Sequence, residues 1–215
     1  MKKLFYLFCL LLAAGVAFIS CRNDDEPPPP DPSVTDTGVL IGYIDGTPIR
    51  WATRNVAARG TFAATPESAG MLFQWNRPQE WNNTDAGIPT DWGNIPTESA
   101  TWIRANDPCP EGWRVPTVEE LRALRGAGVS DWTQLNGVSG RFFGSDNNTI
   151  FLPAAGLRRA YGALYNVGYW GYFWSSTQGT NTTTAWGLQI VSGTTGVQGN
   201  NNRFNGFSVR CVADK

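Results

Sequence analysis

Carboxylates are the side chains of this protein best suited to acid–base chemistry, because its 215 residues include no histidine. The absence of histidine excludes Ser-His-Asp and Cys-His nucleophilic sites, imidazole metal centres and histidine pH switches. A glycosidase needs two carboxyl groups roughly 5 to 10 Å apart, yet no Asp or Glu occurs between residues 147 and 213. Both would come from scattered upstream positions whose spacing singles out no pair: Glu67, Glu80, Asp85, Asp91 and Glu98. We therefore expect a protein that is not an enzyme, and keep an upstream-carboxylate hydrolase as the minority alternative.

Aromatic residues are the second chemically informative group. Eight of them crowd one short stretch, among Asn, Thr, Gln and Gly: Tyr161, Tyr165, Tyr169, Trp170, Tyr172, Phe173, Trp174 and Trp186. Rigid rings beside short polar side chains are the mixture that binding loops favour. The alternative is that the rings form the core. We expect core positions for Trp113, Phe173, Trp174 and Phe207, and leave Trp186 and Phe204 open between core and contact.

The first 20 residues are predicted to be a secretory signal peptide. Lys2 and Lys3 precede an apolar run over residues 4–19, which stops at Ser20 beside Cys21, the layout of an export signal. Residues 18–21 (Phe-Ile-Ser-Cys) resemble a bacterial lipobox, with Phe18 in place of the usual Leu. The resemblance implies that Cys21 is acylated. An ordinary signal peptide with a chance cysteine is the alternative.

Residues 21–37 are predicted to form a lipidated tether. An acidic run over residues 22–26 is followed by prolines at 27–30 and 32, and polyproline stretches stay extended. The acidic run resembles the surface-export signal of some Gram-negative lipoproteins. That resemblance implies an outer-membrane lipoprotein, exposed on the cell surface, whose acylated Cys21 contacts the membrane lipid. The alternative is that solvated acids merely keep a linker extended.

Removal of the predicted signal peptide changes the charge balance and the number of cysteines in the protein. Removing its two lysines from 17 basic residues leaves 15 against 18 acidic ones, a formal charge of −3, so we expect no nucleic-acid partner. Cys9 leaves with the leader and Cys21 carries the lipid, which leaves Cys109 and Cys211 in a compartment where disulfides persist. We predict that these two pair. Their wide spacing argues against a redox or metal pair, which needs close sequence neighbours.

Short apolar runs broken by Gly, Asn, Pro and Thr predict many short strands and long loops from about residue 38 onward. Residues 39–51 fit a hairpin around Asp45-Gly46, and residues 71–75 fit another strand. One segment is predicted to be helical. Thr117 and Glu120 form the pattern of a capping box, and glycines at 126 and 128 supply stop signals.

Four blocks of sequence carry a family resemblance: residues 108–117 (PCPEGWRVPT), 151–158 (FLPAAGLR), 168–177 (GYWGYFWSST) and 205–212 (NGFSVRCV). In this order and at these separations they resemble the FISUMP, or major paralogous, domain over most of residues 40–213. The resemblance implies an α+β, C-type-lectin-like fold with short antiparallel strands, few helices and long loops. We assign this domain to residues 38–215.

The C-terminal blocks also resemble the variable region of proteins diversified by retroelements, in which a fixed C-type-lectin-like scaffold presents randomised surface residues. Ordinary FISUMP members share the same ending, so a diversified and an undiversified surface both stay open. From this resemblance and the aromatic stretch we predict ligand-binding residues in loops between about residues 161 and 205: Tyr165, Gln178, Thr180, Asn181, Trp186, Gln189, Gln198, Asn200 and Phe204.

Calcium needs a separate check, because sugar-binding members of the C-type-lectin-like fold often use it. Such sites need several oxygen ligands grouped on a loop. Residues 146–148 (Asp-Asn-Asn) are a possible cluster, but a turn is their expected role, and neither a Glu-Pro-Asn nor a Gln-Pro-Asp signature occurs. We therefore predict no metal and no cofactor.

Together these features predict a surface lipoprotein whose single domain recognises an extracellular protein or glycan. A structural or accessory subunit of a surface assembly, such as a pilus tip, is the alternative.

Overall fold

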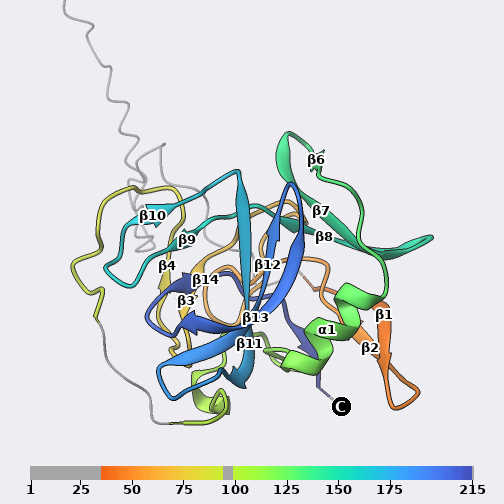
Figure 1. Cartoon of the computed structure of the whole chain (residues 1–215), viewed down its shortest axis with the longest axis horizontal. Helices are drawn as coiled ribbons and strands as arrows, with labels where there is room; N and C mark the ends of the chain where they lie inside the picture. Colours follow the sequence, from red (N-terminus) through yellow and green to blue (C-terminus); the bar gives the residue numbers. More distant parts are fainter. Residues whose placement is uncertain (1–34, 94–98, 215) are drawn as a thin grey trace, which may run out of the picture.

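The computed structural model of the protein describes residues 35–93 and 99–214. The predicted signal peptide, the acylation site Cys21, most of the predicted tether and Glu98 lie outside these residues. Within them the protein is mostly β, with one α-helix and one short 3-10 helix (Figure 1). The short antiparallel strands and the scarcity of helices agree with the sequence-based expectation. Across the described ranges no helix has the length and hydropathy that a membrane crossing requires.

The strands form four sheets, and all pairs of strands within them are antiparallel. One sheet has the order β1 (Val39–Ile44), β2 (Thr47–Trp51), β15 (Val212–Ala213), β5 (Trp113–Arg114). A second has the order β10 (Leu164–Tyr165), β9 (Leu157–Arg158), β14 (Gly206–Phe207), β3 (Leu72–Gln74), β4 (Glu80–Trp81). The third contains β11 (Trp170–Gln178), β12 (Thr184–Val191) and β13 (Thr195–Asn202), and the fourth β6 (Thr133–Leu135), β7 (Val138–Ser145) and β8 (Asn148–Pro153).

Local sequence signals determine the predicted hairpin. Asp45 and Gly46 both have positive φ, 50° and 77°, at the turn between β1 and β2. Two such residues make the tight turn whose twist matches that of the flanking strands, and glycine adopts this conformation at little cost. The predicted strand at residues 71–75 is present as β3. Asp146, also at positive φ, lies in the turn between β7 and β8, as predicted for residues 146–148.

Helix α1 (Val118–Gly126) begins with the predicted capping box. The Thr117 hydroxyl accepts a hydrogen bond from the Glu120 amide at 3.2 Å, and the Glu120 carboxylate accepts one from the Thr117 amide at 2.8 Å. The same carboxylate pairs with Arg114 on β5 at 2.6 Å. Burial opposes ionisation of Glu120, but the hydrogen bonds from Arg114 and Thr117 prevail and lower its pKa. The pair therefore ties the start of α1 to the first sheet.

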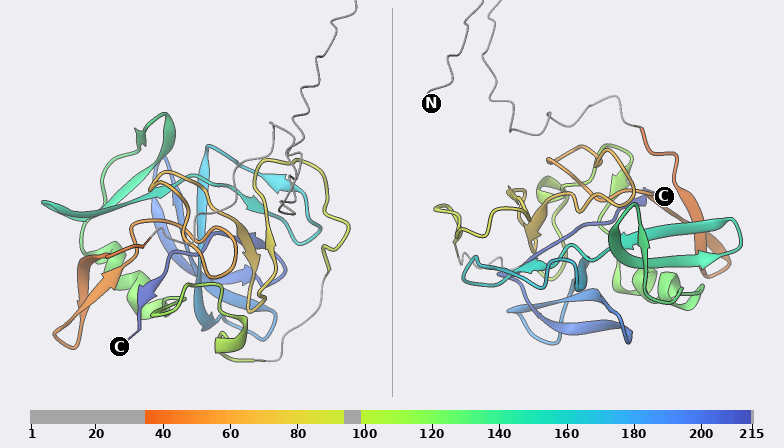
Figure 2. Two further views of the ribbon diagram at one scale, coloured as in Figure 1. Left: turned by 180° about the vertical axis from the view of Figure 1, so that it is seen from behind. Right: turned by 90° about the horizontal axis from the view of Figure 1, so that it is seen from above.

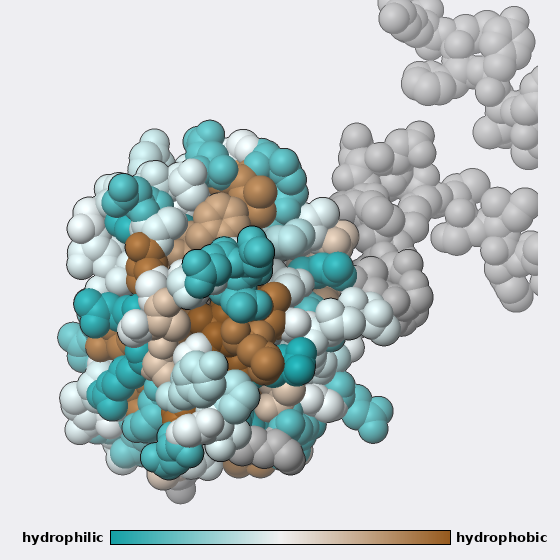
Figure 3. Space-filling model, turned by 90° about the vertical axis from the view of Figure 1, so that its right-hand side faces the viewer, coloured by the Kyte–Doolittle hydropathy of each residue, from teal (hydrophilic) through white to brown (hydrophobic). Residues whose placement is uncertain are grey.

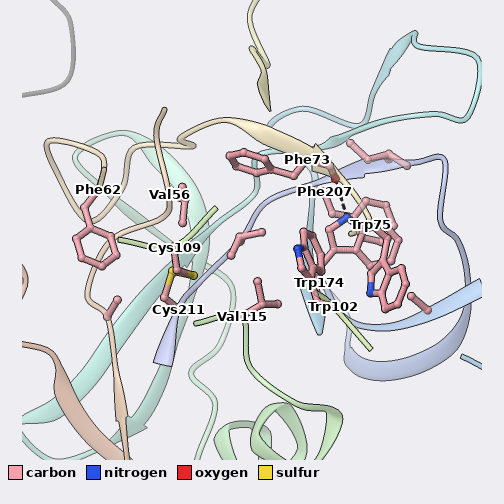
Figure 4. Close-up of a cluster of buried hydrophobic side chains, with 14 residues drawn as sticks. Val56, Phe62, Phe73, Trp75, Trp102, Cys109, Val115, Trp174, Phe207 and Cys211 are labelled. Atoms are coloured by element: carbon pink, nitrogen blue, oxygen red, sulfur yellow. Dashed lines mark hydrogen bonds between the residues drawn. A yellow bond between two sulfur atoms is a disulfide. The ribbon is translucent and has the colours of Figure 1, made fainter. Parts of the chain in front are cut away.

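Two clusters of buried side chains form the core. The first core cluster contains the aromatic residues Phe73, Trp75, Trp174 and Phe207 together with the disulfide, which joins Cys109 to Cys211 as predicted (Figure 4). The Trp174 and Phe207 rings stack with centroids 4.0 Å apart, and the Trp174 indole donates a hydrogen bond to the Phe73 carbonyl at 2.7 Å. The second core cluster places α1 against the β1–β2 hairpin and the β11–β12 strands, through Trp51, Leu121, Leu124, Phe173, Leu188 and Ile190.

The β11–β13 sheet lies between these two clusters and is central to the question of function. Alternate residues point to opposite faces of a strand. On β12, Leu188 and Ile190 therefore contact the second core cluster below α1, while Ala185 contacts the first. Figure 2 shows, in its right-hand view, α1 on one side of this sheet and the segment of residues 157–168 on the other. Much of the region predicted to be loops is thus regular strand.

Candidate binding site

The β9–β10 hairpin carries the exposed tyrosines Tyr161 and Tyr165. Strands β9 and β10 pair through Arg158 with Leu164 and Leu157 with Tyr165. Their connecting turn closes through hydrogen bonds from the Arg159 amide to the Ala163 carbonyl and from the Gly162 amide to the Arg159 carbonyl. Gly162 has φ of +90°, and a Cβ there would lie 2.8 Å from the Ile88 side chain. The turn requires a glycine at this position.

Arg158 anchors this hairpin from within. Its side chain is 1% exposed and donates hydrogen bonds to the carbonyls of Asn82, Asp85, Gly87 and Gly162, at 2.7 to 3.0 Å. Because neighbouring residues on a strand point to opposite faces, the inward direction of Arg158 leaves the next residue, Arg159, at the surface. The hairpin is therefore fixed to the loop of residues 82–87 while its outer face stays open.

A surface hollow of about 250 Å³ lies beside the hairpin. We call it the tyrosine hollow, and its lining residues are Leu157, Arg159, Ala160, Tyr161, Tyr165, Tyr172 and Asn205. Tyr161 and Tyr165 are 60% and 46% exposed. The Arg159 guanidinium carbon lies 3.8 Å from the centroid of the Tyr165 ring, a cation–π contact. The hollow thus combines aromatic faces, one cation and one amide.

Tyr172 connects the hollow to the core. Its ring stacks on Phe207, with centroids 4.8 Å apart, and on Trp170, with centroids 5.9 Å apart. Burial raises the pKa of its hydroxyl, against the opposing effects of Asn166, Arg159 and Gln189. The phenol therefore stays protonated at neutral pH and serves as both donor and acceptor. A ligand in the hollow would contact a residue that the packed aromatic cluster holds in place.

The predicted ligand-binding residues divide between the two faces of the β11–β13 sheet. Tyr165 lines the hollow, and Gln189 lies beside it as the cross-strand neighbour of Tyr172. Gln198 lies on β13 opposite Gly187, on the same face of the sheet as Gln189. Trp186 lies on the α1 face instead, where its ring sits 4.7 Å from the Arg122 guanidinium carbon. The sequence-based expectation placed these residues on one surface, but Trp186 and Gln189 lie on opposite faces of the sheet.

The physical reason is strand periodicity. Trp186 and Gln189 are three positions apart on β12, and an odd separation places two side chains on opposite faces of a strand. The prediction treated these residues as loop residues, for which no such rule holds. Trp186 is also half-buried, because it covers Gly199, whose position leaves room for the indole ring.

The remaining predicted residues lie at the end of the β11–β12 hairpin, on β13 and just after β13. The Gln178 side chain accepts a hydrogen bond from buried Arg203 at 3.0 Å. Thr180 and Asn200 are exposed, and the exposed Asn181 accepts hydrogen bonds from the Thr183 amide and hydroxyl. Phe204 is half-buried, and its carbonyl accepts a hydrogen bond from Gln74. Gln178 and Asn181 therefore have structural contacts that explain them without a ligand.

Six of the seven lining residues of the hollow were not among the predicted site residues: Leu157, Arg159, Ala160, Tyr161, Tyr172 and Asn205. Tyr161 belongs to the aromatic stretch noted in the sequence, and Arg159 is one of four arginines in the acid-free segment of residues 147–213. These were the signals that could have found them. Asn205 resembles its polar neighbours, and only the fold brings it to the hairpin.

Three of the upstream carboxylates, Glu67, Asp85 and Asp91, accept hydrogen bonds in the described structure. Glu67 lines a separate groove of about 590 Å³, together with Asn83 and Asn136. The hydrogen bond from Asn136, at 2.9 Å, lowers the pKa of Glu67, so this carboxyl is ionised rather than poised as a proton donor. Asp85 accepts a hydrogen bond from the Gly87 amide, and Asp91 accepts one from the Trp81 indole. The first of these hydrogen bonds closes a turn, and the second holds the Trp81 ring in place.

A third hollow lies on the opposite side of the molecule, between β1 and the end of α1. It measures about 480 Å³, and Leu40, Tyr43 and Ala123 are among its lining residues. Figure 3 faces this side and shows apolar surface in the middle of a largely polar face. Leu40 and Tyr43 are exposed there.

In the described residues 35–93 and 99–214, no group of three or more Asp, Glu or Cys side chains gathers as metal ligands do.

Comparison with known proteins finds one family model that matches part of the chain, and no activity. A family model described as a domain of unknown function (DUF8237) matches residues 132–212. This range runs from β6 to β15 and includes every residue that lines the tyrosine hollow. No curated protein and no solved structure matches the chain.

Proposed function

We propose that the protein is an exported binding protein that recognises an extracellular glycan or protein through the tyrosine hollow. Its domain would be a C-type-lectin-like domain of the FISUMP type, carried by an outer-membrane lipoprotein on the cell surface and anchored through acylated Cys21. The FISUMP sequence blocks and the lipobox-like leader support this assignment, and the disulfide accords with an oxidising compartment.

The observation that carries the proposal is the exposure of two aromatic rings on a rigid hairpin. Tyr161 and Tyr165 belong to neither core cluster, so the fold does not explain them. The buried side chain of Arg158 donates hydrogen bonds to Gly162 in the turn and to Asp85 in the adjoining loop, and so ties the hairpin to that loop. A rigid aromatic surface loses little conformational entropy when a ligand binds, which is the advantage of a preformed site.

The chemistry of the hollow favours recognition over turnover. Its lining offers phenol hydroxyls, a guanidinium and an amide, and these residues include no carboxyl or thiol. Such groups donate and accept hydrogen bonds but supply no general base near neutral pH. Among the upstream carboxylates that a hydrolase would use, Glu67, Asp85 and Asp91 each accept a hydrogen bond from a neighbouring group of the protein.

A double substitution tests this site. We expect Tyr161→Ala with Tyr165→Ala to weaken binding about tenfold or more, because each ring supplies stacking contacts. The free energy of unfolding should change by no more than about 0.5 kcal/mol per exposed ring. A glycan and protein array probed with the full-length protein, purified in detergent, gives the binding readout, and thermal unfolding gives the stability.

Trp186→Ala provides the matched control, because it removes an aromatic ring from the α1 face of the β11–β13 sheet, away from the tyrosine hollow. We expect it to retain binding. Loss of binding in Trp186→Ala, with the tyrosine variant unaffected, would move the site to the α1 face and refute the tyrosine hollow.

A further inference from the structure

The arginines of the acid-free segment have no carboxylate within their own stretch of sequence. Residues 147–213 contain Arg158, Arg159, Arg203 and Arg210 and no Asp or Glu. Three of these four side chains are buried, with 1%, 4% and 1% exposure for Arg158, Arg203 and Arg210. Each buried arginine donates hydrogen bonds to backbone carbonyls, so a structural role accounts for it.

Arg159 is the exception. It is half-exposed at the rim of the tyrosine hollow, and its guanidinium lies against the Tyr165 ring. Among the described residues no carboxylate oxygen lies within 4.0 Å of it. A guanidinium that packs on a ring through its carbon can still donate from its nitrogens, in the fork that matches a carboxylate or sulfate.

The surroundings leave this charge uncompensated. The residues that line the hollow include one cation and no acid. A positive group in a concave, partly apolar site attracts anions more strongly than the same group on an open surface. The hollow is therefore complementary to a negatively charged ligand group.

The dimensions and walls of the hollow indicate what bears that group. A volume of about 250 Å³ suits one ring-sized group rather than a folded peptide segment. Tyrosine rings present flat apolar faces against which the C–H face of a sugar ring can pack, with hydroxyls at their rims. Asn205 adds an amide donor and acceptor for sugar hydroxyls. A charged sugar residue uses all of these groups at once.

We propose, on the basis of the binding function above, that the tyrosine hollow takes an acidic sugar residue of a glycan. Its carboxylate or sulfate pairs with the edge of the Arg159 guanidinium, and its ring lies against Tyr161 and Tyr165. The charge thus determines which glycan binds, while the rings provide most of the contact area.

Matched oligosaccharides test the proposal with the full-length protein in detergent. The probes are a galacturonic acid oligomer and its methyl ester, and a sulfated galactan oligomer and its desulfated form. Calorimetry should show one charged oligomer binding at least tenfold more tightly than its neutral counterpart, and weakening as salt rises. The charged oligomer that binds more tightly shows whether the ligand group is a carboxylate or a sulfate.

Variants at Arg159 show whether this side chain is responsible. We expect Arg159→Gln to reduce the affinity for the charged oligomer tenfold or more, and the affinity for the neutral oligomer by a much smaller factor. Arg159→Lys, which keeps the charge and loses the fork, should give an intermediate loss. The wild-type comparison of each acid with its neutral form does not depend on the variants, so it decides the question even if a variant folds poorly.

Three results would overturn the acidic-sugar ligand: equal binding of charged and neutral oligomers, an unchanged charge preference in Arg159→Gln, or no binding of any oligomer. Tight binding of a polyglutamate peptide in place of the sugars would also overturn it. None of these results refutes the binding function itself, which an array without any ligand for the wild type would contradict. A tyrosine double variant that retains every array ligand would refute the tyrosine hollow as the binding site.

Discussion

Replacing Cys109 and Cys211 together by alanine is expected to lower the free energy of unfolding by about 4–5 kcal/mol. The disulfide spans 102 positions of the sequence, and a cross-link over so long a loop removes much of the entropy of the unfolded chain. Both cysteines are also buried in the first core cluster, beside Val56 and Val115 (Figure 4). The bond joins the loop before β5 to the chain that enters β15, so its loss affects the centre of the fold.

Guanidinium denaturation of the oxidised wild type and of the double variant measures this effect. The wild type reduced with dithiothreitol is the control, and it should unfold at nearly the same denaturant concentration as the double variant. A difference below about 1 kcal/mol between oxidised wild type and double variant would contradict the stabilising role, since exported domains typically lose more when a native disulfide is removed.

Arg210→Met is expected to lower the free energy of unfolding by about 3 kcal/mol or more, at nearly constant side-chain volume. The guanidinium donates hydrogen bonds to Asn55 Oδ1 at 2.9 Å and to the carbonyls of Ala52 and Phe151 at 3.2 and 2.9 Å. All three acceptors would remain buried without a donor. Burial lowers the pKa of Arg210 to about 9, so it is still protonated at neutral pH and its bonds are charge-assisted.

Arg122→Met is the matched control for this prediction. The Arg122 side chain is 51% exposed and lies 3.6 Å from Glu119, a surface pair of the kind that contributes about 0–1 kcal/mol. Urea denaturation of both variants should therefore show a large loss for Arg210→Met and a small one for Arg122→Met. Equal losses would mean that the buried contacts of Arg210 do not hold the 52–55 segment to β8.

Features encoded by neighbouring residues were predictable from the sequence. The Asp45-Gly46 turn and the Thr117–Glu120 capping box each involve a few adjacent residues, and both are present. The disulfide was predictable because Cys9 was assigned to the signal peptide and Cys21 to the lipid, which left two cysteines to pair. Phe173, Trp174 and Phe207 are buried as expected. Trp113 was expected in the core but is half-buried, and its ring makes an edge contact with Phe62 at 5.5 Å.

The candidate site depended on information that the sequence spreads over long distances. The hollow combines the β9–β10 hairpin with Tyr172 from β11 and Asn205 from the end of the chain. Strand β14, which pairs with β9 and places Phe207 under Tyr172, brings these segments together. Polar residues around Trp186 were mistaken for loop residues because Gln, Asn and Thr are common in loops. Regular alternation on β12 was the signal that would have separated Trp186 from Gln189.

Tyrosine nitration with and without the strongest array ligand tests the tyrosine hollow most directly. Tyr43, Tyr161, Tyr165 and Tyr169 are exposed, and all four should react with tetranitromethane in the free protein. With ligand bound, mass spectrometry should show protection of Tyr161 and Tyr165, while Tyr43, on the far side beside α1, remains reactive. Unchanged nitration of Tyr161 and Tyr165 at saturating ligand would contradict a binding site in the tyrosine hollow.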